Sequence, residues 1–254
     1  MTGGDPIAGL LLVDKPVGPT SMAVCARVRG ALKAGGAPKR IKVGHGGTLD
    51  PLATGLIVVL VGPATKLCET IMAGEKRYKA EIDLSSTSPS DDLESEPVAV
   101  RVDHETTRTE IESVLPAFTG RIMQAPPAFS AMKIGGKRAY TLARAGRLDR
   151  LEPRPVQIHE LAIVSYDWPR LVLDIRCGKG TYIRSLARDL GRSLGVGGML
   201  SGLRRTAVGR FDVADATPLG DVPRSLTRAD LDVPPEVGAI LARRRAAPGH
   251  RAGD

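Results

Sequence analysis

The stretch from Gly44 to Gly55 constrains the fold of this chain more than any other. It reads GHGGTLDPLATG and sets one carboxylate, Asp50, among residues that either free or restrict the backbone. Glycine adopts positive φ and permits close approach of another chain, whereas Pro51 biases Asp50 toward an extended conformation. The apolar run that follows, Leu56 to Val61, predicts a buried strand. An Asp before Pro in a loop is by itself most often a turn residue. This longer string instead predicts a carboxylate on a rigid loop, which suits a nucleophile or an acid/base.

The composition is that of a globular protein without a membrane span. The 254 residues are enough for one large domain or two small ones, and 42% of them are hydrophobic. No apolar run approaches the roughly 20 residues that cross a bilayer, and residues 1–9 carry no secretory signal. The three cysteines form neither a CxxC pair nor a disulfide framework, which suits a reducing cytoplasm: Cys25, Cys68 and Cys177, the last expected in the core. We therefore expect a cytoplasmic protein.

The charge is unevenly distributed. A net charge of +8 favours a polyanionic partner, nucleic acid first. Acidic residues dominate between residues 81 and 112, and basic residues dominate between 121 and 154. This segregation predicts a local polyanion-binding element. Because aromatic residues are only 3% of the chain, RNA recognition would rely on shape and phosphate contacts with one or two placed rings.

Hydrophobic periodicity predicts strands and helices that interleave without strict βα alternation. The expected strands are 9–14, 56–61, 78–84, 156–164 and 171–177, and the expected helices are 22–32, 111–118, 181–194 and 235–244. Thr20 or Ser21 is expected to cap the first helix and Thr181 the third, and Gly120 to end the second. The fold class predicted is mixed α/β (α+β) with a central sheet.

Four segments resemble, in the same order, motifs of the bacterial tRNA pseudouridine-55 synthase (TruB) family. They are DKPVGPTS at 14–21, GHGGTLDPLATG at 44–55, KRY at 76–78 and GKGTYIRSLARDLG at 178–191. The basic stretch 126–140 resembles the RNA-binding insertion of that family, and Leu203-Arg204-Arg205 resembles its last motif. The resemblance, which runs from residue 10 to about 213, implies a pseudouridine synthase fold. That fold has a central mixed, mostly antiparallel sheet flanked by helices and loops.

The resemblance also implies a domain layout. A catalytic domain would span 8–218, with an RNA-binding insertion at about 121–154. Many members carry a further C-terminal RNA-binding domain. Residues 219–254 look too few and too polar for one, so we expect a partly disordered extension with one short helix. The loop after the KRY strand, residues 85–92, departs from the family pattern. Since that loop holds no catalytic residue in the family, the departure would affect local structure alone.

The resemblance assigns catalytic roles to three residues. Asp50 would be the catalytic carboxylate, and whether it attacks the ribose or abstracts a proton is left open. Tyr78 would stack on the uracil with its hydroxyl near C5, and Arg184 would pair with Asp50 through a bidentate contact. From the residues alone, Tyr78 reads equally as core and Arg184 as a helix-surface arginine.

The remaining candidates would bind substrate. His45 would contact RNA where the target base leaves the stack, and Leu203, which otherwise reads as core, would line the uracil pocket. Lys15 is expected beside the catalytic loop in a mainly structural role. The other candidate binding residues are Gly44, Lys133, Lys137, Arg138 and Lys179. A metal site at His45 is rejected because no second His or Cys lies at ligand spacing.

The sequence thus predicts an enzyme that isomerises a uridine in the T loop of tRNA after flipping it out, without cofactor or metal. The partner expected is the T-arm of tRNA, with no membrane and no obligate protein partner, so a monomer. Three alternatives stand beside this prediction. They are a synthase of the same fold for another RNA, a tRNA-folding chaperone without catalysis, and a metal-dependent hydrolase around His45 and Asp50.

Overall fold

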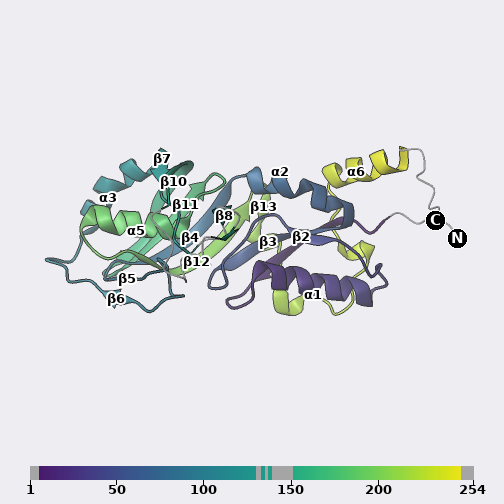
Figure 1. The fold of residues 1–254 in the computed structure, drawn as a ribbon, viewed down its shortest axis with the longest axis horizontal. Coiled ribbons are helices and arrows are strands. Elements are labelled where there is room, and N and C mark those ends of the chain that lie inside the picture. The colour runs from purple at the N-terminus through teal and green to yellow at the C-terminus, as the bar shows by residue number, and fades with distance from the viewer. Residues whose placement is uncertain (1–5, 130–132, 135–136, 139–150, 247–254) are drawn as a thin grey trace. The chain divides into compact units, whose positions relative to one another are not determined.

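A computed structural model of the chain describes residues 6–129, 133–134, 137–138 and 151–246 (Figure 1). The chain divides into two compact units. The first combines residues 1–74 with 207–254, and the second is residues 75–206. Each unit is described by itself below. None of the helices within the described residues is long and apolar enough to cross a membrane.

The first unit is built on strands that pair mostly antiparallel. Strand β1 (Gly9–Lys15) runs antiparallel to β3 (Thr54–Val61) from Gly9↔Val61 to Lys15↔Gly55. Strand β2 (Val43–His45) also pairs antiparallel with β3, and β14 (Thr217–Pro218) pairs parallel with β1. All side chains from Leu56 to Val61 have 0% exposure, so β3 is covered on both faces, as its unbroken apolar run predicts.

Helices from both ends of the chain cover the sheet of the first unit. Helix α1 (Ser21–Ala34) begins where the Thr20 hydroxyl accepts a hydrogen bond from the Ala23 amide, which confirms Thr20 as its cap. The 3-10 helix η1 (Gly62–Leu67) and helix α2 (Cys68–Ala73) follow β3, and α6 (Pro235–Ala246) lies against η1. Val237 and Leu241 of α6 join a core formed with β1, β3 and η1. The remaining short elements are β13 (Phe211–Asp212), η3 (Val213–Asp215), η4 (Leu219–Asp221) and η5 (Arg228–Asp230).

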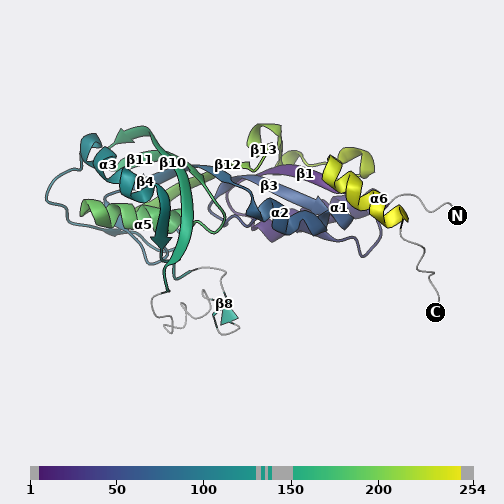
Figure 2. The same ribbon diagram turned by 90° about the horizontal axis from the view of Figure 1, so that it is seen from above.

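The second unit holds five strands in the order β12-β4-β11-β10-β7, of which β4, β11, β10 and β7 pair antiparallel. Strands β10 (Arg154–Asp167) and β11 (Arg170–Cys177) form a long hairpin beside β4 (Lys76–Asp83), as Figure 2 shows. Strand β7 (Gly120–Gln124) pairs with the start of β10, and β12 (Met199–Val208) lies on the other side of β4. Two small hairpins complete the strands: β5 (Ser86–Thr87) with β6 (Val98–Ala99), and β8 (Lys133–Ile134) with β9 (Lys137–Arg138).

Helices α3 (Arg108–Val114) and α5 (Ile183–Leu194) pack on each other in the second unit. Gly191 of α5 lies so close to the chain at Gly197 that a β-carbon there would come within 2.1 Å of the Gly197 carbonyl oxygen. Only glycine fits this contact, which brings α5 against the chain that leads into β12.

The described structure confirms the mixed α/β class with mostly antiparallel pairing and corrects two details. The helix expected at 111–118 ends as an α-helix at Val114 and continues as the 3-10 helix η2 (Leu115–Phe118), because Pro116 cannot donate the backbone bond. Thr181 does not cap α5. Its hydroxyl donates to the Gly178 carbonyl, and the N-cap is Tyr182 without a side-chain cap. The helix expected at 235–244 is confirmed as α6, whereas the tail after residue 246 and most of the basic insertion lie outside the described residues.

Candidate active site

The loop that carries Asp50 is fixed to the start of α1. The buried Ser21 hydroxyl donates to the Leu49 carbonyl at 3.0 Å and accepts from the Leu49 amide at 2.8 Å. On the other side of the carboxylate, the Ala53 amide donates to the Asp50 carbonyl at 3.1 Å. Asp50 itself is half-buried. The amide and the carbonyl of Leu49, the residue before Asp50, are therefore both held by the Ser21 side chain, which limits how far Asp50 can move.

Lys15 holds the same loop from the end of β1. Its ammonium has 0% exposure and donates to the carbonyls of Pro16 at 2.9 Å and Pro51 at 3.1 Å. The Gly18 amide donates to the Pro51 carbonyl as well, at 2.9 Å. These contacts fit the structural role that the sequence suggested for Lys15, because a buried ammonium requires such partners.

Two glycines and a histidine shape the approach to this loop. Gly47 has φ of 140°, which side chains rarely adopt, and a β-carbon at Gly46 would lie 2.3 Å from Ile71 Cγ2. At Gly44 the nearest atom to a β-carbon would be 3.9 Å away, so space does not demand glycine there. The His45 ring accepts the Gly47 amide at Nδ1, at 3.4 Å. In the neutral imidazole the hydrogen then sits on Nε2, which can act as a donor.

In the second unit, Tyr78 projects from the buried face of β4 and has 9% exposure. Its hydroxyl is hydrogen-bonded by Arg205, which lies on the neighbouring strand β12 and has 1% exposure. A guanidinium can only donate, so the Tyr78 oxygen accepts from Arg205 and its own proton points elsewhere. Burial lowers the pKa of Arg205, and the contact with Tyr78 works in the opposite direction.

Alternation along β12 places Leu203 on the same side as Arg205. Gly202 faces the other way, since a β-carbon there would lie 3.3 Å from the side chain of Glu81 on the outer face of β4. Successive residues of a strand point to opposite faces, so Leu203 and Arg205 share the face of Tyr78. The role of Leu203 in lining a uracil pocket stays a prediction.

The face of β4 that carries Tyr78 is also electropositive. Lys76 is buried at 8% exposure, and its pKa is lowered by burial first and by the charge of Arg205 next. The exposed Lys179 adds a further positive charge within electrostatic range of Lys76. Burial raises the pKa of the nearby Cys177 thiol to about 11, in keeping with its expected place in the core.

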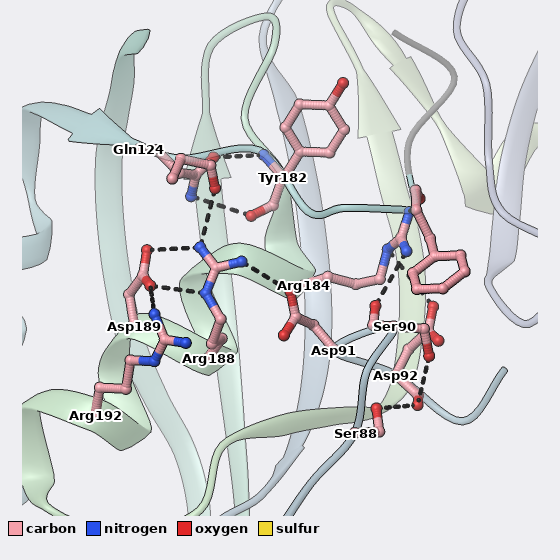
Figure 3. A network of polar contacts seen from close by, with 12 residues as sticks. Ser88, Ser90, Asp91, Asp92, Gln124, Tyr182, Arg184, Arg188, Asp189 and Arg192 are labelled. Atoms are coloured by element: carbon pink, nitrogen blue, oxygen red, sulfur yellow. Dashed lines mark hydrogen bonds and ion pairs between the residues drawn. The ribbon is translucent and has the colours of Figure 1, made fainter. Parts of the chain in front are cut away.

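Arg184 lies in the first turn of α5 and is held by polar groups of the second unit (Figure 3). Its Nη1 donates to the Ser90 carbonyl at 3.2 Å and its Nη2 to the Phe129 carbonyl at 3.0 Å. Its Nε lies 3.5 Å from Asp92 Oδ2, and both side chains are less than a tenth exposed. Asp92 lies in the loop that was expected to matter only for local structure, and this contact shows that it fixes Arg184 instead.

The structure brings together part of the predicted set within each unit. Asp50, His45, Gly44 and Lys15 belong to the first unit, whereas Tyr78, Arg184, Lys179 and Leu203 belong to the second. The pairing of Asp50 with Arg184 joins residues of different units and stays a prediction. Of the basic insertion, Lys133 and Arg138 are partners in the β8–β9 hairpin, which also contains Lys137, and their side chains are outside the described atoms.

Sequence reasoning missed Asp92 and Arg205. Arg205 belongs to a motif that was recognised, and its i+2 spacing from Leu203 could have indicated a shared face. Asp92 gives no such local signal, because its partner Arg184 is far along the chain. Across the described residues, no group of three His, Cys, Asp or Glu side chains is arranged to hold a metal ion.

Comparison with known proteins identifies the family. The profile of the TruB family pseudouridylate synthase N-terminal domain matches residues 36–183, more than half of the chain. The chain belongs to the TruB family. The profile of the tRNA pseudouridylate synthase B C-terminal domain matches residues 184–235, so the two profiles meet in the first turn of α5.

Relatives and solved structures agree with this assignment. A tRNA pseudouridine synthase B of Rhodopseudomonas palustris is 45% identical over 88% of this chain and 59% of its own length. One of Gluconobacter oxydans is 43% identical over 86% and 64%, and one of Phocaeicola vulgatus is 42% identical over 88% and 95%. The chain thus spans about 60% of the first two relatives.

Among solved structures, a Cbf5-Nop10-Gar1 complex contains a chain that superposes with a TM-score of 0.64 and 28% identity. The superposition covers 84% of this chain and 53% of that one. Together with family membership, this likeness confirms the expected fold.

Proposed function

We propose that this protein isomerises uridine 55 in the T loop of tRNA to pseudouridine, with Asp50 as the catalytic carboxylate. The observation that carries the proposal is the loop of Asp50, which matches the family motif and is fixed on both sides of the carboxylate by Ser21 and Lys15. A catalytic group must be held within a fraction of an ångström of its working position, and buried hydrogen bonds provide that restraint.

The reaction breaks the glycosidic bond between C1′ and N1, turns the uracil, and forms a bond between C1′ and C5. The proton on C5 is lost and N1 gains one, so the atoms balance without an external reagent. Asp50 either adds to the sugar or takes the proton that starts the cleavage, and either role needs its ionised form. Arg184, held by Asp92 on one side of its guanidinium, would orient that carboxylate.

Tyr78 would support the base. Its ring belongs to the buried face of β4, and Leu203 on the neighbouring strand shares that face. With the phenolic oxygen accepting from Arg205, the hydroxyl proton is directed away from the protein cation. Only after losing this proton could the oxygen receive the C5 proton at the end of the reaction, and a cationic donor on the oxygen favours that ionised form.

Charge and family membership support tRNA as the substrate. The net charge of +8 favours a polyanion, and the family relatives are named for tRNA. A buried T-loop uridine has to be flipped out before its bonds can be reached, and the Nε2 hydrogen of His45 could contact the RNA at that point. A synthase of the same family for another RNA remains the main alternative. A chaperone without catalysis would not need the tightly held Asp50 loop.

The test is incubation of the purified protein with an unmodified tRNA transcript, followed by site-resolved pseudouridine mapping. We expect conversion at position 55 and none in Asp50→Asn, whose Kd for tRNA should stay within about twofold because the substitution keeps size and polarity. Asp215→Asn, an exposed change far along the chain, is the matched control and should retain full turnover. Conversion by the Asn variant, with deamidation excluded, would refute the role of Asp50, and modification at another site would refute the substrate.

A further inference from the structure

Helix α5 carries a second arginine, Arg188, one turn after Arg184 and on the same side of the helix. Figure 3 shows its guanidinium between the loop at Asp91 and the chain just after β7. Nη1 donates to Asp91 Oδ2 at 2.8 Å, and Nη2 donates to the Ala125 carbonyl at 2.9 Å. Nε donates to Asp189 Oδ1 at 2.9 Å. The side chains of Arg188 and Asp91 are only 14% and 12% exposed, so this is a largely buried junction rather than a surface ion pair.

The partner of Arg188 has an unusual backbone. Asp91 has φ of 60°, the left-handed region that residues other than glycine rarely adopt. Its amide donates to the Ser88 carbonyl and its carbonyl accepts the Leu200 amide, so the turn is fixed at both peptide groups. The two residues that flank Asp91 supply two acceptors of Arg184: the Ser90 carbonyl on one side and the Asp92 carboxylate on the other. The left-handed turn at Asp91 therefore sets where both acceptors point.

Helix α5 and its N-cap residue hold the end of β7 and the segment after it at three places. The Gln124 side chain accepts from the Tyr182 amide at 2.8 Å and donates to the Tyr182 carbonyl at 3.1 Å. Arg188 then holds Ala125, and Arg184 holds Phe129. Arg184 and Arg188 thus share both of their neighbours, the loop at 90–92 and the segment 124–129.

We propose that Arg188 is a positioning residue for the reaction, and that it acts through Arg184 by holding Asp91 in its left-handed turn. The inference rests on the proposed function. A planar fork that reaches two carboxylates and one carbonyl at once cannot be replaced by a lysine, which is a single point charge on a flexible stem. Arg188→Lys keeps the charge and should lose the geometry.

The experiment compares Arg188→Lys with Arg192→Lys as the matched control. Arg192 lies one turn further along α5, is 63% exposed in its side chain, and approaches Asp189 at 3.9 Å. We expect the single-turnover rate at saturating enzyme to fall about tenfold in Arg188→Lys, with tRNA Kd changed less than twofold. Arg192→Lys should change neither. Rates are measured well below the Tm of each variant, so that unfolding does not affect them. If Arg188 has only a structural role, Arg188→Lys will lower the Tm and leave the rate unchanged. That result would overturn the proposal.

A double-mutant cycle identifies the route. If Arg188 acts through Arg184, then adding Arg188→Lys to Arg184→Lys should cost little further rate, whereas independent effects would multiply and contradict the proposal. Asp91→Asn, which tolerates the left-handed turn, should show the same non-additivity. The Nε–Hε resonance of Arg184 in NMR spectra of the Arg188 variant provides a readout without turnover. It should shift, and an unchanged resonance would overturn the proposal. If the wild-type protein converts no uridine, the proposed function fails, and this resonance still decides whether Arg188 positions Arg184.

Discussion

At the scale of single residues, the second unit relies on buried cations. Three of them are each less than a tenth exposed: Arg205, Lys76 and Arg184. Arg184 has a proposed catalytic role, and the other two lie on or beside the strand that carries Tyr78. A buried charge is costly unless it is hydrogen-bonded, so such groups are often kept for geometry rather than stability. Arg205 illustrates this, since its contact with Tyr78 fixes the phenolic oxygen.

Arg205→Met tests whether this arginine serves Tyr78. The substitution keeps much of the volume and removes the charge, so the free energy of unfolding should change by less than about 2 kcal/mol in either direction. The single-turnover rate should fall at least tenfold, because the Tyr78 hydroxyl loses its donor. Both quantities are measured, by urea denaturation and by quench-flow. Arg204→Met, on the opposite face of β12, serves as the control. Equal rates in the two variants would show that Tyr78 does not depend on Arg205.

At the scale of elements, the loop between β2 and β3 takes its shape from α1 and β1. Ser21 is in the first turn of α1, Lys15 is the last residue of β1, and each binds a backbone group of the loop. The turn that the sequence DKPVGPTS predicts therefore does more than join a strand to a helix. It brings two polar side chains to the peptide groups that flank Asp50.

Ser21→Ala should weaken this junction. Both the Leu49 amide and the Leu49 carbonyl lose a buried partner, which should lower the free energy of unfolding by about 2 kcal/mol. Hydrogen exchange of the Leu49 amide should also become faster than in the wild type, by mass spectrometry or NMR. Ser193→Ala, at an exposed position of α5, should change stability by less than about 0.5 kcal/mol. A stability loss without faster exchange at Leu49 would mean that Ser21 supports α1 and not the loop.

At the scale of the whole molecule, charge and chain connectivity matter most. The unit that carries Asp50 is assembled from both ends of the chain, and Val237 and Leu241 of α6 complete its core. The segment after residue 219 thus contributes to the fold up to α6, which its polar composition did not suggest. The net charge of +8 concentrates in the basic stretch at 121–154, which the sequence assigns to RNA binding.

Removing charge from that stretch should weaken tRNA binding without slowing the chemistry. We expect the quadruple change of Lys133, Lys137, Arg138 and Arg144 to Ala to raise Kd and flatten the plot of log K against log salt. Each lost phosphate contact should reduce the slope by about 0.7 to 0.9. The control removes the same charge at exposed, scattered positions: Lys33, Lys39, Arg101 and Arg224. If the insertion variant binds tRNA with unchanged affinity and salt slope, the RNA-binding residues lie outside this stretch.

The sequence by itself determined the family, the main helices and five of the strands: β1, β3, β4, β10 and β11. It did not indicate β7 or β12. These features depend on local patterns: the alternation in β4, the unbroken apolar run of β3, and motifs of fixed spacing. Thr20 as the cap of α1 was predictable for the same reason, because a cap lies three residues from its partner. The prediction that Thr181 caps α5 was wrong for a local reason too, because its hydroxyl donates to the Gly178 carbonyl instead.

Only the tertiary structure decided which polar groups hold the proposed catalytic residues. Asp92 and Arg184 are distant in sequence, and so are Ser21 and Leu49, and no spacing rule connects them. Such contacts arise when strand order and helix packing bring separate segments together. Because these groups are buried, the loss of one hydrogen bond leaves a polar group without water to replace the partner. The sequence names the residue types that chemistry needs, but the partners that fix them follow from the packing of the whole unit.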